Sequence, residues 1–148
     1  MGLFTPARRR QETARRQRAD RRNDARTVFE HAARMAGLDL LLRPHTWQHL
    51  VARHHADSAL AAVVPAPAGE GRVRVRLAGP LLAELLAGLF EDMESQAHEP
   101  DAEAARAVAA TLYPRLAAIV RPLGFGALPA DPAQVGEAEV DTPWTAGT

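Results

Sequence analysis

The sequence predicts a mainly helical α+β fold, with four to five helices and one small antiparallel β-hairpin. Two observations lead to this prediction. Large apolar residues recur at helical spacing in several separate segments, and residues 72–77 alternate strictly between arginine and an apolar residue, which is typical of a half-buried strand. Since a lone strand leaves its backbone groups without partners, the second observation requires a neighbouring strand.

The chain divides into three parts by composition. With 148 residues, of which 47% are hydrophobic, it can bury one core. Residues 1–25 contain many arginines and almost no large apolar residue, so we expect a basic arm that is helical or disordered. Residues 26–128 form the single α+β domain, and residues 129–148, rich in Gly, Pro and acids, form a disordered acidic tail.

The front half of the domain predicts two helices. Apolar spacing from Val28 predicts a helix over 26–36 that is capped by Gly37 and continues the arm. The short apolar run 38–42 fits either a strand or a buried connection. Trp47 and the apolar residues after it predict a helix over 46–57, with Thr46 as its N-cap.

The hairpin follows these helices. Strand 72–77 is preceded by a Pro/Gly-rich stretch, 65–71, that reads as its loop, and the nearest candidate partner strand is 59–64. The Ala-rich composition of 58–64 also allows a helix there, and the sequence leaves this choice open.

The back half predicts two long helices. A wide apolar stripe from Leu81 to Met93 follows Gly79 and Pro80, and a second stripe from Val108 to Val120 follows Pro100. Pro114 lies inside the second stripe, whose spacing continues across it, so we expect a kink rather than a break.

Enzyme chemistry has little support. The chain has no cysteine, and all 18 basic residues are arginine, which excludes thiolate and lysine nucleophiles. Four histidines fall at 45, 49, 54 and 55, but one helix cannot direct three of them at one ion, so neither a metal nor a cofactor is expected. No Ser–His–acid arrangement suggests a triad. We therefore expect a non-enzymatic protein.

The uneven distribution of charge is the one feature of the sequence that points to a function. Residues 1–76 contain fifteen arginines and seven acids, whereas residues 77–148 contain three arginines and eleven acids. Such an asymmetry indicates an anionic partner for the front half or attraction between the halves. Arginines of the arm, of the 46–57 helix and of the alternating strand are the candidate nucleic-acid contacts: Arg8, Arg9, Arg10, Arg15, Arg16, Arg18, Arg21, Arg22, Arg53, Arg72, Arg74 and Arg76.

Two function classes remain open. The order helix, helix, hairpin is similar to that of winged helix-turn-helix domains, which favours a nucleic-acid-binding or regulatory accessory protein, although 38–45 is long for the tight turn. Alternatively, the chain is an interaction module that binds a protein partner or self-associates through the helix containing Leu85 and Leu89. Leu-rich segments are interrupted by charges and no apolar secretory segment is evident, so we expect a cytoplasmic protein without membrane insertion; the Arg/Ala bias is typical of a GC-rich bacterial genome.

Overall fold

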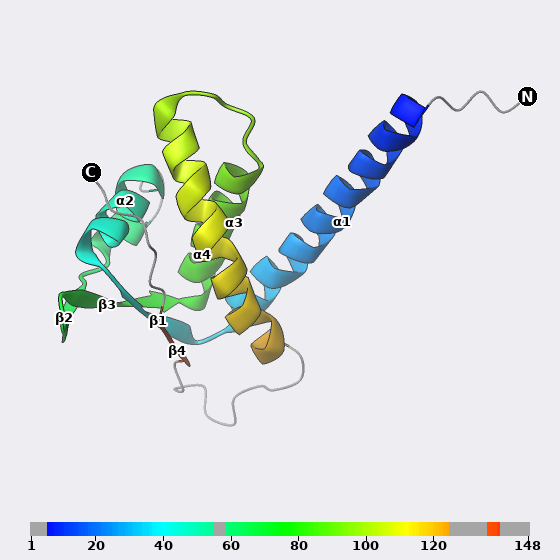
Figure 1. The fold of residues 1–148 in the computed structure, drawn as a ribbon. Helices are drawn as coiled ribbons and strands as arrows, with labels where there is room; N and C mark the ends of the chain where they lie inside the picture. The colour runs from blue at the N-terminus through cyan, green and yellow to red at the C-terminus, as the bar shows by residue number, and fades with distance from the viewer. Residues whose placement is uncertain (1–5, 55–58, 125–135, 140–148) are drawn as a thin grey trace, which may run out of the picture.

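The computed structural model describes residues 6–54, 59–124 and 136–139, which place helices on one face of a small sheet (Figure 1). This arrangement confirms the predicted mainly helical α+β class. In chain order, the elements are α1 (Pro6–Arg34), β1 (Gly37–Leu42), α2 (Pro44–His54), the 3-10 turn η1 (Ala59–Ala62), β2 (Ala66–Gly69), β3 (Arg72–Ala78), α3 (Gly79–Glu94), α4 (Pro100–Gly124) and β4 (Gly136–Glu139).

The sheet has the strand order β2-β3-β1-β4. Strand β3 lies between β2 and β1 and is antiparallel to both, while β4 runs parallel to β1. The register places Val75 opposite Leu40 and Leu77 opposite Leu38. Because side chains alternate along a strand, these pairs give the sheet one apolar face, and the helices cover it.

The hairpin is shorter than the sequence suggested. The partner of β3 is Ala66–Gly69, inside the stretch expected to be a loop, whereas 59–62 forms the 3-10 turn η1. Gly69, Glu70 and Gly71 all have positive φ, at 79°, 54° and 73°. Gly69 and Gly71 adopt positive φ without strain, so the hairpin closes in a tight turn. The partner strand is therefore nearer to β3 along the chain than the sequence suggested.

The first two helices begin and end differently from the prediction. The arm and the helix predicted over 26–36 are one continuous helix, α1, which ends at Arg34. Gly37 is therefore not a helix cap but the first residue of β1, which resolves 38–42 as a strand. Helix α2 begins at Pro44, so Thr46 is not its N-cap but a buried residue of its first turn; the end predicted for this helix, 55–57, lies outside the described residues.

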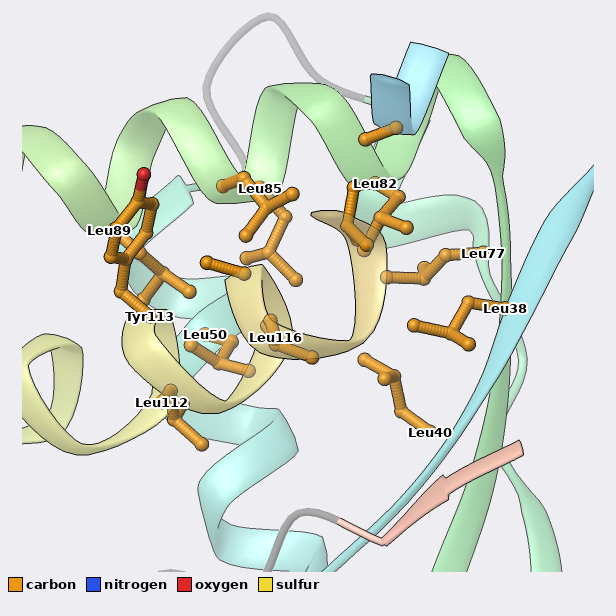
Figure 2. Packing of buried hydrophobic residues seen from close by; sticks show 14 of the residues in the cluster. Leu38, Leu40, Leu50, Leu77, Leu82, Leu85, Leu89, Leu112, Tyr113 and Leu116 are labelled. Carbon is orange, nitrogen blue, oxygen red and sulfur yellow. The ribbon is translucent and has the colours of Figure 1, made fainter. Parts of the chain in front are cut away.

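The core lies between the helices and the apolar face of the sheet. Figure 2 shows leucines of α3 and α4 meeting Leu38 and Leu40 of β1, Leu77 of β3 and Leu50 of α2. Leu85 and Leu89 are each only 1% exposed. Both side chains therefore fill the core and are not part of any surface of α3. Self-association through the helix that contains them stays a prediction that would depend on its other residues.

The back half follows the predicted elements. Helix α3 has the expected bounds near Gly79 and Met93, and α4 begins at Pro100 and continues through Pro114 as one helix. Strand β4 falls inside the stretch expected to be a disordered tail; the other residues of 129–148 lie outside those described. No described helix has both the length and the apolar content needed to cross a bilayer.

Candidate nucleic-acid interface

The basic arm is the free part of α1, which we define as residues 6–23. Every residue from Pro6 to Asp24 is exposed, and the first buried residue of α1 is Ala25. From there, Ala25, Val28 and Ala32 pack into the core, so the helix is anchored at its C-terminal third alone. The arm thus stands away from the domain as a helix with solvent around it (Figure 1).

Eight arginines and two acids lie on this arm, which gives it a net charge of +6. An α-helix turns about 100° per residue and rises about 1.5 Å, so the arm residues Arg8, Arg15 and Arg22 fall within about 40° of each other and of Arg26, just beyond the arm, along roughly 27 Å. They form one continuous basic stripe. The remaining arm arginines lie on other sides of the helix, so positive charge surrounds it.

Two ion pairs hold the base of the arm. Nε of Arg21 lies 3.1 Å from Oε1 of Glu94 at the end of α3, and Nη2 of Arg121 on α4 contacts Oδ2 of Asp24. N-terminal to Arg21, the arm arginines make no ion pair with the part of the chain that the structure describes. Their charge is therefore directed to solvent.

The strand arginines lie elsewhere. In β3, Val75 and Leu77 point into the core, so Arg72, Arg74 and Arg76 point from the opposite face of the sheet. Nε of Arg76 lies 2.8 Å from Oδ1 of Asp39 on β1, and its Nη2 lies 3.1 Å from Oδ2. This bidentate hydrogen bond, with a smaller contribution from the charges of Arg76 and Arg74, holds the pKa of Asp39 below its ordinary value.

The arm and the strand arginines are not brought together. Helix α1 packs on α3 and α4 and rises on the side of the sheet that these helices cover (Figure 1). The burial pattern of β3 places its arginines on the other side. One continuous cationic surface, which the order helix, helix, hairpin suggested, is therefore absent from the described residues. Arg76 also has a carboxylate of its own chain as its partner.

Arg53, the predicted contact on α2, is also paired. Its Nη2 lies 3.1 Å from Oδ1 of Asp92 on α3, and Nε2 of His54 lies 3.3 Å from the other carboxylate oxygen. Helix α2 turns its Trp47 and Leu50 into the core. These contacts make α2 a packing element tied to α3 and leave it little freedom to enter a groove of DNA.

The sequence analysis did not predict the cluster of Arg53, His54 and Asp92, although the position of Asp92 indicated that it needs a partner. Asp92 stands three residues after Leu89 and seven after Leu85, at the edge of the apolar stripe, where a carboxylate requires a partner. Burial lowers the pKa of His54 and of His49, and the charge of Asp92 partly opposes this in both. Among the described residues, no group of three or more metal-ligating side chains converges.

The candidate interface is thus reduced to the arm. Of the twelve predicted residues, Arg8, Arg9, Arg10, Arg15, Arg16, Arg18, Arg21 and Arg22 share α1, and Arg53, Arg72, Arg74 and Arg76 do not join them. Comparisons with models of known protein families, with curated proteins and with solved structures give no match for this chain.

Proposed function

We propose that the protein binds nucleic acid through the arm alone, with arginines of α1 contacting phosphates. The observation that supports this is the exposure of the whole segment 6–23, which carries eight arginines and no large apolar residue. Such a helix buries nothing within its own domain. Its charge is best used against a polyanion, where each phosphate contact releases a condensed counterion.

The shape of the arm suits a duplex. An α-helix with its side chains is about 10–12 Å wide, and the major groove of B-DNA is about 12 Å wide, so a free helix enters it without distorting the DNA. Arginine is suited to this role because its planar guanidinium donates two parallel hydrogen bonds to one phosphate. Phosphate contacts of this kind supply affinity that does not depend on the base sequence.

The salt dependence of binding tests the proposal. We expect the affinity for a fluorescent duplex, measured by anisotropy, to fall steeply between about 50 and 200 mM salt. Arg8→Gln with Arg15→Gln removes two charges from the basic stripe and should flatten the slope of log K against log salt by about 2.

Arg72→Gln with Arg74→Gln is the matched control, because it removes the same charge from the opposite face of the sheet. It should leave the slope nearly unchanged. Equal losses in both double variants would show that binding follows net charge rather than the arm, and absence of binding at low salt would end the proposal. A duplex RNA of the same length shows whether the arm distinguishes the two helix forms.

A further inference from the structure

An open groove of about 480 Å³ lies between α1 and α3, at the level where the arm leaves the domain. It is lined by Arg22, Ala25, Arg26 and Phe29 of α1 and by Ala87, Phe90, Glu91 and Glu94 of α3. Arg22 and Arg26 also belong to the basic stripe, but the proposed nucleic-acid binding does not account for the aromatic and acidic residues beside them.

The floor of the groove is aromatic. The rings of Phe29 and Phe90 meet edge to face at 6.1 Å, and Tyr113 of α4 lies against both, at 6.5 and 5.5 Å. Tyr113 is buried, whereas both phenylalanines keep part of their surface in contact with solvent. This apolar area is therefore incompletely covered by the domain itself.

The two walls carry opposite charge. On each helix the aromatic residue lies near the buried face, and the charged residues lie farther from that face. Arg22 and Arg26 form the wall on α1, and Glu91 and Glu94 form the wall on α3. Glu94 also contacts Arg21, while Arg22, Arg26 and Glu91 are exposed and have no ion-pair partner among the described residues.

From this charge arrangement we infer that the groove is an interface between two copies of the chain, related by a two-fold axis that runs along it. Rotation about such an axis brings the basic wall of each copy opposite the acidic wall of the other, and it brings the two aromatic floors together. A surface with one positive and one negative edge is self-complementary under this operation. A ligand with a single sign of charge is instead repelled by one of the walls.

Charge reversal of one wall at a time tests the interface, with the full chain and without nucleic acid, so the result is independent of the proposed function. Sedimentation velocity should show a dimer for the unaltered protein. Arg22→Glu with Arg26→Glu gives two acidic walls, and Glu91→Arg with Glu94→Arg gives two basic walls. Each should raise the dimer dissociation constant by at least about tenfold.

Reversal of both walls in one chain restores opposite charges, and this fourfold variant should dimerise again. Arg9→Glu with Arg16→Glu makes the same charge change on another side of α1 and should dimerise like the unaltered protein. Circular dichroism checks that each variant is folded. A monomer at every concentration, dissociation constants that do not differ among the variants, or a folded fourfold variant that stays monomeric would overturn the inference.

Discussion

Individual residues explain how tightly α1, α3 and the sheet are joined. Gly79 begins α3 where it passes the end of α1, and a Cβ at this position would lie 2.6 Å from the carbonyl oxygen of Ala32 and closer still to that of Met35. The backbone itself occupies this space, so it cannot give way as a side chain does. Glycine is therefore required by close approach at a point where three elements meet.

Gly79→Ala should destabilise the protein by about 1–3 kcal/mol, since the added methyl group forces α1 and α3 apart. Gly88→Ala is the comparison, because the three atoms nearest to a Cβ there belong to the ring of His54, the closest at 2.6 Å. A side chain can shift where backbone cannot, and alanine favours the helix by up to about 1 kcal/mol, so we expect a smaller loss of stability. Chemical denaturation gives both free energies of unfolding. A Gly79→Ala variant as stable as Gly88→Ala would contradict the packing described for this corner.

The histidines near Asp92 predict a dependence of stability on pH. Burial lowers the pKa of His54 below its ordinary 6.5, so below that pH the unfolded chain binds a proton that the folded chain does not yet accept. Stability contributed by neutral His54 is thus fully present above about 6.5 and is lost as the pH falls through the folded pKa. His49 acts in the same direction.

We therefore expect the free energy of unfolding to decrease between pH 7 and pH 5, and His54→Gln to reduce that slope. Exposed His98, outside the cluster, provides the control, since His98→Gln should keep the slope of the unaltered protein. Urea titrations at several pH values measure how the free energy of unfolding depends on pH. A slope that is identical in all three proteins would show that His54 does not contribute to it.

At the scale of single residues, the sequence indicated which charged side chains matter but not which residues they contact. It identified the arginines and histidines, but not that Arg53 and Arg76 are paired with Asp92 and Asp39. These carboxylates are 39 and 37 residues away along the chain, and only the packing of α2 on α3 and the register of β1 with β3 bring them close. Sequence spacing within one element can show that a carboxylate needs a partner, but it does not identify that partner.

Among the elements, periodicity was a good guide wherever one face is buried. The apolar stripe of α3 and the alternation of β3 predicted both elements, because each has to bury one face. Strand β2 and strand β4 carry no such signal. Their residues, APAG and GEAE, are paired through the backbone with β3 and β1, and such pairing leaves no hydrophobic period in the sequence.

The two parts of helix α1 are stabilised to very different extents. Residues 25–34 pack on the core, whereas 6–20 are supported by their own helical hydrogen bonds alone. Amide hydrogens of 6–20 should therefore exchange within seconds, and those of Val28 to Ala32 at least about a hundredfold more slowly. Exchange measured by mass spectrometry tests this. Equal protection along the whole of α1 would indicate that a partner already covers the arm.

The whole molecule places its positive arm on one side of the sheet and its strand arginines on the other. Composition predicted the basic front half but not this separation, because the direction in which a helix leaves its domain depends on how its buried end packs. If two copies join along the α1–α3 groove, the two-fold axis along that groove sends both arms in the same direction. Two such arms present their charge to a single duplex.

The most direct test of the central claim is hydrogen–deuterium exchange of the full chain with and without a short DNA duplex at low salt. Binding through the arm predicts slower exchange over residues 8–22 and no change over Arg72–Ala78 of β3. Slower exchange at β3 with an unchanged arm would contradict the account.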